Sequence, residues 1–268
     1  PVFTERTSVG LDVHARSVVA AAIDTHTGKT KTARLVPSHE VVLEWVRELP
    51  GPVAACYEAG PTGYGLYRAF VAAGIRCEVA APSKIVRPAG DRVKTDAKDA
   101  LLLARLLRMD EIVSVRVPSI TEEAARDLVR AREDARIDLM AARHRLSKLL
   151  LRHGHVYTGG KAWTPDHDRW LRSIRFDQYG TQAAFETGFE DVLFTAARRD
   201  GLDRQIELMA ASSEFTDVVN RLCCLRGIAT LTGFGLAVEV GDWTRFDGNS
   251  IGAFLGLAPG EASTGDRH

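Results

Sequence analysis

Apolar residues recur in steps of three and four between residues 128 and 149, and this spacing limits the fold more than any other feature. It predicts one long helix with an apolar seam along one face. Ser119, Thr121 and Glu122 can cap the start of this helix, and Gly154 marks its end. Such a seam usually packs against a partner helix, which can come from this chain or from another subunit. The seam consists of Leu128, Ala131, Ala135, Leu139, Ala142, Leu146 and Leu149.

Residues 1–118 show a different pattern, in which short apolar strands alternate with helices. The turn at 26–29 has a glycine where a positive φ is expected, and it predicts that the strands beside it are antiparallel. Helices are expected after the N-cap Ser38, over 62–73 and over 97–109. The predicted fold class of this part is therefore α/β. Strands are expected at 8–14, 17–24, 31–36, 52–57 and 77–81.

The rest of the chain predicts further helices. Residues 155–179 combine two glycines, five aromatics and mixed charge, which is typical of a connector, whereas 181–222 have helical spacing. A length of 268 residues suits more than one domain. We therefore predict an α/β domain at 1–118, a long-helix coiled-coil segment at 119–160, a helical connector at 161–224 and a mainly α C-terminal domain at 225–268.

The net charge of zero conceals an uneven distribution along the chain. Residues 1–118 hold 16 basic and 13 acidic groups, residues 119–160 hold 8 and 6, and residues 161–268 hold 11 and 16. Two basic groups stand out, one in the loop beside Asp96 and one at the end of the long helix. They are either solvated surface or contacts to a nucleic-acid backbone. Their members are Lys84, Arg87, Arg92 and Lys94, and Arg143, Arg145, Lys148 and Arg152.

Other features exclude several classes of protein. The four cysteines form neither a disulfide framework nor a C-x-x-C zinc pair. No apolar run reaches the roughly 18–20 residues of a membrane span, and the first residues do not resemble a signal peptide. We therefore expect a soluble, cytoplasmic protein without a membrane partner.

Four carboxylates lie where a metal-dependent phosphoryl-transfer site would use them. Asp12 lies within the first strand, Glu58 follows the fourth, and Asp96 and Asp99 open the helix that comes after the basic loop. The i, i+3 spacing of Asp96 and Asp99 places both on one helical face. Carboxylates and water are the ligands that Mg²⁺ prefers, and two such ions can polarise a phosphodiester. The sequence therefore predicts a metal site of Asp12, Glu58, Asp96 and Asp99.

Three of these acids also have a simple structural explanation. Asp96 can cap a helix, Asp99 can favour the first turn, and Glu58 can end a strand. Asp12 is harder to explain in this way, because a carboxylate in a core strand is costly unless it is paired or metal-bound.

Four segments resemble the DEDD transposases of the bacterial insertion-sequence one-ten family. They are GLDVH (10–14), YEAGPTGYGLYR (57–68), APSKIVRPAGDRVKTDAKDALLLARLL (81–107) and FLGLAPGEASTG (254–265). The order of three antiparallel strands, helix, strand, helix, strand, helix resembles a ribonuclease-H-like, RuvC-like domain. The resemblance extends over nearly the whole chain.

The resemblance implies a mechanism and partners. It implies that the four acids form a DEDD site for Mg²⁺, with Mn²⁺ as a substitute, and that Ser263 is a nucleophile, with Thr264 as the alternative in register. It implies donor and target DNA, selection of DNA by a structured noncoding bridge RNA, a homodimer or tetramer, and a location at the bacterial nucleoid. Members of the family continue beyond the motif that ends here, so we expect the serine domain to be truncated.

Three other functions fit parts of the sequence. A RuvC-like resolvase would use the acids to activate water, and Ser263 would be incidental. A binding or assembly module could use the same fold without catalysis. An actin-like phosphotransferase could begin with GLDVH, but the chain lacks duplicated phosphate loops. A weak helix–hairpin–helix pattern at 225–235 is explained equally well by phosphate contact or by tight helix packing.

Overall fold

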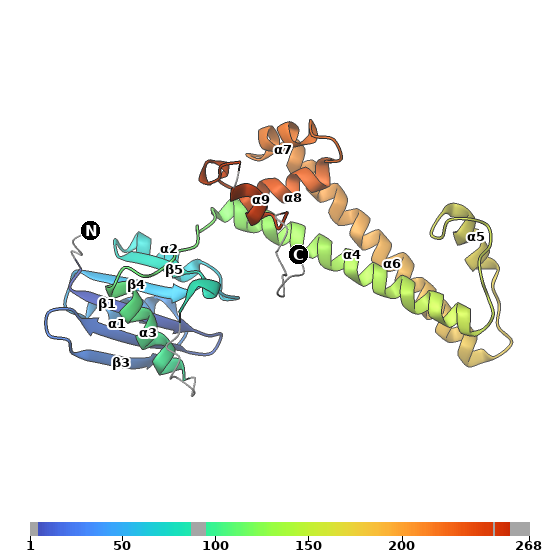
Figure 1. The fold of residues 1–268 in the computed structure, drawn as a ribbon. Helices are drawn as coiled ribbons and strands as arrows, with labels where there is room; N and C mark the ends of the chain where they lie inside the picture. The colour runs from blue at the N-terminus through green and yellow to red at the C-terminus, as the bar shows by residue number, and fades with distance from the viewer. Residues whose placement is uncertain (1–4, 87–94, 249, 258–268) are drawn as a thin grey trace, which may run out of the picture. The chain divides into compact units, whose positions relative to one another are not determined.

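The computed structural model describes residues 5–86, 95–248 and 250–257, and the chain divides into two compact units (Figure 1). The N-terminal unit comprises residues 1–117 and the C-terminal unit residues 118–268. Four of the predicted site residues lie outside the described residues: Arg87, Arg92, Lys94 and Ser263. Each unit has its own core.

The N-terminal unit contains a five-stranded sheet with the order β3-β2-β1-β4-β5. β1 pairs antiparallel with β2, and β2 pairs antiparallel with β3, whereas β1–β4 and β4–β5 are parallel. This confirms the predicted element order of a mixed α/β unit, which is consistent with a ribonuclease-H-like domain. The strands are β1 (Thr7–Val13), β2 (Val18–Asp24), β3 (Thr30–Leu35), β4 (Val53–Glu58) and β5 (Arg76–Ala80), and the helices are α1 (His39–Arg47), α2 (Gly65–Ala72) and α3 (Asp96–Arg108).

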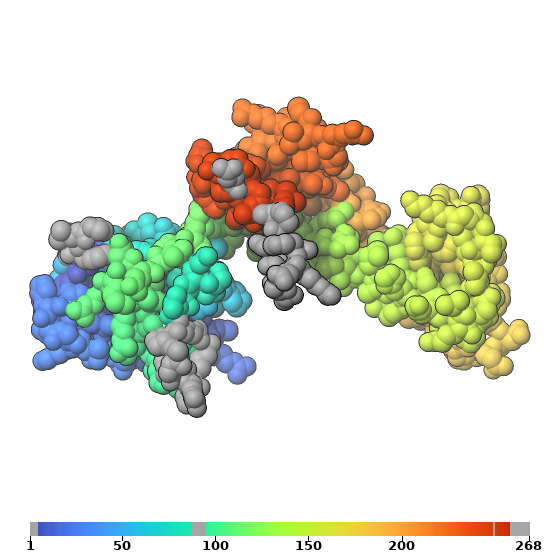
Figure 2. All heavy atoms as spheres, in the orientation of Figure 1, coloured from blue at the N-terminus to red at the C-terminus, as the bar shows by residue number. Residues whose placement is uncertain are grey.

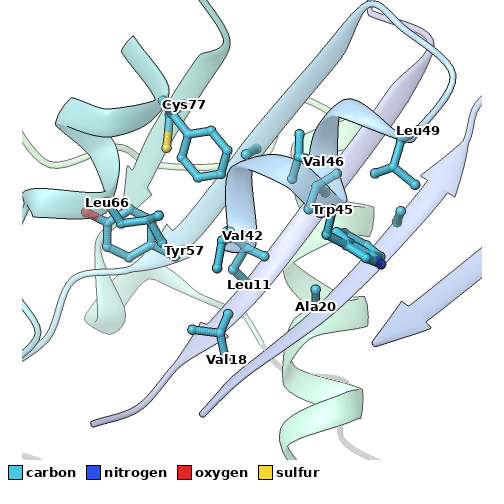
Figure 3. Packing of buried hydrophobic residues seen from close by; sticks show 14 of the residues in the cluster. Leu11, Val18, Ala20, Val42, Trp45, Val46, Leu49, Tyr57, Leu66 and Cys77 are labelled. Atoms are coloured by element: carbon cyan, nitrogen blue, oxygen red, sulfur yellow. The ribbon is translucent and has the colours of Figure 1, made fainter. Parts of the chain in front are cut away.

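The larger core of this unit lies between one face of the sheet and helices α1 and α2. Residues that alternate along the strands, such as Leu11 and Tyr57, point to this side and are fully buried. Figure 3 shows Val42, Trp45 and Val46 of α1 packed against them. Burial of these apolar side chains is the main force that holds the helices to the sheet. Because the pattern has a period of two, the residues between them must face α3.

Helix α3 approaches the other face of the sheet unusually closely, because the residues there are small. Gly10 of β1 is the tightest point: an added Cβ would lie 2.0 Å from the carbonyl oxygen of Ala100 and 2.4 Å from the amide nitrogen of Ala104. Beside it, the thiol of Cys56 donates to the carbonyl oxygen of Leu103 at 3.3 Å. The backbone of α3 therefore lies almost directly on β1 and β4, which fixes the position of its first turn.

The described part of the C-terminal unit is helical and is organised by two helices of 33 residues each. The long helix predicted from the seam is α4, and its capping box is present: Ser119 accepts from the amide of Glu122, whose carboxylate accepts from the amide of Ser119. Its partner is α6, from the same chain. The helices are α4 (Ile120–Arg152), α5 (Pro165–Ser173), α6 (Tyr179–Ala211), α7 (Thr216–Cys223), α8 (Thr230–Val240) and α9 (Ser250–Phe254).

Separate clusters hold the two ends of the α4–α6 pair. At one end, α7 and α8 pack around Phe215 and Phe234, and Arg126 of α4 donates to the carbonyl oxygens of Val238 and Glu239. At the other end, α5 packs on the pair through Leu171. Figure 2 shows the second end as the yellow-green and yellow lobe. None of the helices that the structure describes combines the length and apolar character needed to cross a membrane.

One sequence-based expectation for this unit was wrong in part, and another lacked an element. The segment 155–179, predicted as a connector, contains α5, whose N-cap Thr164 accepts from the amide of His167. The helical stretch predicted over 181–222 is interrupted between Ala211 and Thr216, where the hydroxyl of Thr216 accepts from the amide of Ser213. At Thr164 the side-chain hydrogen bond starts a helix, whereas at Ser213 and Thr216 such bonds compete with helix continuation. Hydrophobic spacing reports neither effect.

Candidate metal centre

Asp12 lies near the end of β1, on the sheet face covered by α3. Gly10, two residues earlier, faces α3 directly, and the alternation of the strand places Asp12 on the same side. Its side chain is 20% exposed, so the carboxylate reaches the end of the interface rather than its interior. The costly position of Asp12 in an apolar strand is thus resolved: the carboxylate lies where the buried interface opens to solvent.

Glu58 reaches the same edge from the neighbouring parallel strand. The register pairs Gly10 with Cys56 and Leu11 with Tyr57, so Asp12 and Glu58 each follow one residue later. Because Cys56 faces α3, Glu58 faces it too. The hydroxyl of Tyr57 donates to the carbonyl oxygen of Gly63 and accepts from the amide of Tyr67, which anchors the segment after Glu58. Burial raises the pKa of this phenol, so it stays protonated.

Asp96 and Asp99 lie in the first turn of α3, the turn next to this edge. The N-cap Thr95 accepts from the amide of Lys98 and sets the start of the helix. Asp96 lies four residues before Ala100, the residue in contact with Gly10, so it belongs to the sheet-facing side of α3. Both carboxylates are half-buried. All four predicted acids therefore belong to elements that meet at one edge of the N-terminal unit.

Asp12, Asp96 and His14 come closest together. One ligand atom from each lies within 4.8 Å of the other two, and Nε2 of His14 is 3.0 Å from Oδ2 of Asp12. Glu58 and Asp99 are not members of this tightest group. Arg34 of β3 lies beside the group: Nη1 is 4.0 Å from Oδ2 of Asp96, and Nη2 donates to Oγ of Ser17. A hollow of about 600 Å³ adjoins Asp96 between β2, β3 and α3.

The donor set fits a divalent cation. Two carboxylates and one imidazole converge, and a third carboxylate lies on the adjacent strand. Carboxylates that gather at a partly exposed edge repel one another, and a cation relieves that repulsion. Within the described residues, His14 is the member of this group that was not predicted as a ligand. Its spacing of two from Asp12 places it on the same strand face, and that was the signal available in the sequence.

The basic residues at the end of α4 do not form one exposed group. Arg145 pairs with Asp191 of α6 at 2.9 Å, and the guanidinium of Arg143 stacks 4.8 Å from the centre of the Trp163 ring. Burial, and then the charge of Arg199, lower the pKa of Arg143. Lys148 and Arg152 are exposed and border a hollow of about 1000 Å³ between α4 and α6. Lys84, the last residue of the short 3-10 helix Pro82–Lys84, is also exposed.

The fold and the acidic edge define the class: a mixed α/β unit with a carboxylate cluster suited to divalent metal, joined to a helical unit. Comparison with known families agrees with this class. Residues 9–154, which contain all four acids, match the DEDD transposase family of the IS110 type, and residues 219–268, which contain Ser263, match the IS116/IS110/IS902 transposase family.

Individual relatives lead to the same family. A protein of Sinorhizobium fredii named "Putative transposase y4qE" is 42% identical over 212 residues, which are 79% of this chain and 51% of that protein. The transposase for insertion sequence element IS1533 of Leptospira borgpetersenii is 34% identical over 241 residues, 88% of this chain and 70% of that protein. The chain thus spans about half the length of the first relative. The chain belongs to the IS110 family of transposases.

Proposed function

We propose that the protein of which this chain is a part is a transposase that cuts and rejoins DNA with a DEDD metal site and a serine nucleophile. The observation that carries the proposal is the convergence of Asp12 and Asp96 within the segment matched by the DEDD transposases. Asp12, Glu58, Asp96 and Asp99 would hold Mg²⁺, for which Mn²⁺ can substitute. The bound ions would withdraw charge from the scissile phosphate.

The residues of the chain would divide the reaction between them. The four acids would hold and orient the cations, and Arg34, which lies beside Asp96, would attract a phosphate oxygen. The oxygen of Ser263 attacks phosphorus, a new O–P bond forms, and the bond from phosphorus to one deoxyribose oxygen breaks. That oxygen leaves as a hydroxyl with the proton that the serine loses. Attack by the hydroxyl of a second strand reverses these changes, which joins the strands and frees the serine.

Substitution of the serine tests the nucleophile. In the full-length protein with its DNA, Ser263→Ala is expected to remove the covalent protein–DNA adduct completely and to stop strand cutting. Ser147→Ala, which changes an exposed serine of α4, serves as the matched control and should retain both. Adducts are detected by denaturing electrophoresis of end-labelled DNA. Cutting that survives in Ser263→Ala would favour the rival, a RuvC-like endonuclease that uses activated water, unless Thr264→Ala removes it.

We further propose donor and target DNA, a structured noncoding guide RNA and a homodimer or tetramer as partners. Support for the nucleic-acid partners comes from the exposed cations Lys148 and Arg152, which border a hollow large enough for a nucleic-acid backbone. Arg145 lies beside them, although Asp191 neutralises part of its charge. Lys84, Arg87, Arg92 and Lys94 would contact nucleic acid near the metal centre. A location at the bacterial nucleoid would follow from these partners.

Charge reversal tests the nucleic-acid surface on α4. Lys148→Glu is expected to weaken binding of nucleic acid by about tenfold at low salt and to reduce the slope of log affinity against log salt by about 1. The matched control is Arg204→Glu on the exposed side of α6, which should change neither quantity. The ligand is the RNA that copurifies with the full-length protein, identified by sequencing. Equal effects of both variants would show that Lys148 affects binding only through the net charge of the protein, and not through a contact on α4.

A further inference from the structure

His14 lies at the candidate metal centre, although it is not one of the four acids of the DEDD set. It is the first residue after β1, and its amide donates to the carbonyl oxygen of Ser17, which closes the connection to β2. This bond fixes the backbone of His14 next to Asp12. The imidazole is 53% exposed, so it is not held there by burial in a core.

The separation of the donor atoms matches that of two ligands of one ion. Ligand atoms about 2.1 Å from a six-coordinate ion lie about 3.0 Å apart when they occupy adjacent positions. Nε2 of His14 and Oδ2 of Asp12 are 3.0 Å apart, and Asp96 offers an oxygen within 4.8 Å of both. A single ion can therefore contact all three side chains with only small movements.

We propose that His14 is a direct ligand of the divalent ion held by Asp12 and Asp96, and that it gives this position a preference for Mn²⁺ over Mg²⁺. Imidazole nitrogen suits transition metals, whereas Mg²⁺ favours carboxylate oxygen and water. The inference rests on the proposed metal site and adds to it a nitrogen ligand and a metal preference.

The same distance also fits a hydrogen bond from Nε2–H of His14 to Asp12. In that arrangement His14 would position the carboxylate, and its nitrogen would carry a proton instead of a metal. The tautomer decides between the two arrangements, and direct detection of a metal–nitrogen bond separates them.

Pulsed electron paramagnetic resonance of the Mn²⁺-loaded full chain gives that detection. The wild type is expected to show nitrogen-14 modulation from a directly bound imidazole, and His14→Gln is expected to lose it. His26→Gln, which removes an exposed histidine of the β2–β3 turn, should keep it.

By calorimetry, His14→Gln is expected to weaken Mn²⁺ binding by about tenfold and Mg²⁺ binding by less than about twofold. Unchanged thermal unfolding of His14→Gln confirms that the fold is intact.

Two measurements distinguish an error in the role of His14 from an error in the metal site itself. If Asp12→Asn weakens Mn²⁺ binding but the wild type shows no nitrogen-14 modulation, His14 only positions Asp12 and the inference is overturned. If Asp12→Asn leaves binding of Mn²⁺ and Mg²⁺ unchanged, the metal site itself is elsewhere and both proposals fall.

Discussion

Asp12→Asn is expected to lower the rate of DNA cutting and rejoining by the full-length protein by about a thousandfold. The substitution keeps the size of the side chain but removes the negative charge at the point where β1 meets α3, two residues after the close contact of Gly10. Loss of a metal ligand removes several kcal/mol of transition-state stabilisation, and about 4 kcal/mol corresponds to a thousandfold. Rates are measured with labelled DNA at saturating Mg²⁺.

Glu44→Gln provides the control for this variant. Glu44 is an exposed acid on α1, the helix that covers the opposite face of the sheet from α3. Its neutralisation changes the net charge of the unit equally and should leave the rate unchanged. An Asp12→Asn protein that folds and retains more than about a tenth of the wild-type rate would contradict the assignment of Asp12 as a metal ligand.

Gly10→Val is expected to destabilise the N-terminal unit by at least about 3 kcal/mol. Any Cβ at this position lies 2.0 Å from the carbonyl oxygen of Ala100 and 2.8 Å from Cβ of Leu103, so α3 must move away from the sheet. Overpacking that displaces backbone costs at least 1–3 kcal/mol, and a branched side chain adds to the clash. Because Asp96 begins the same helix, the displacement also separates it from Asp12.

Thiol labelling of the full chain measures this loss within one unit. Cys56 is buried against Leu103 of α3, so it reacts only when the N-terminal unit opens, and 3 kcal/mol corresponds to about hundredfold faster labelling. Cys223 is exposed and serves as the internal reference. Gly60→Ala is the matched control, because an added Cβ there meets only the carbonyl oxygen of Glu58 at 3.9 Å. Equal labelling of Cys56 in both variants would show that α3 does not need the small residue.

Much of the fold could be predicted because hydrophobic spacing is a local property. The short apolar runs of β1 and β2 and the seam of α4 both depend on residues close in sequence. The spacing could not say that α6, and not a second subunit, covers the seam, because both partners bury the same surface. Nor could it show why position 10 is glycine: the reason is the backbone of α3, about ninety residues later.

The sequence predicted which acids form the candidate site, but it predicted their arrangement in space only in part. The positions of Asp12 and Glu58 follow from the strands that carry them, and the register places them side by side. A spacing of two places His14 on the face of Asp12, but its 3.0 Å approach depends on the closure of the β1–β2 connection. The pairing of Arg145 with Asp191 joins residues 46 apart in sequence, and no local pattern contains it.

We propose that Asp12 and Asp96 hold a catalytic divalent ion at the edge where β1 meets α3. Anomalous X-ray scattering from a crystal of the chain equilibrated with Mn²⁺ tests this most directly. We expect an anomalous peak within about 2.5 Å of a carboxylate oxygen of both residues. A crystal with this edge open to solvent and saturating Mn²⁺, but with no peak between Asp12 and Asp96, would show that these two residues do not hold the ion.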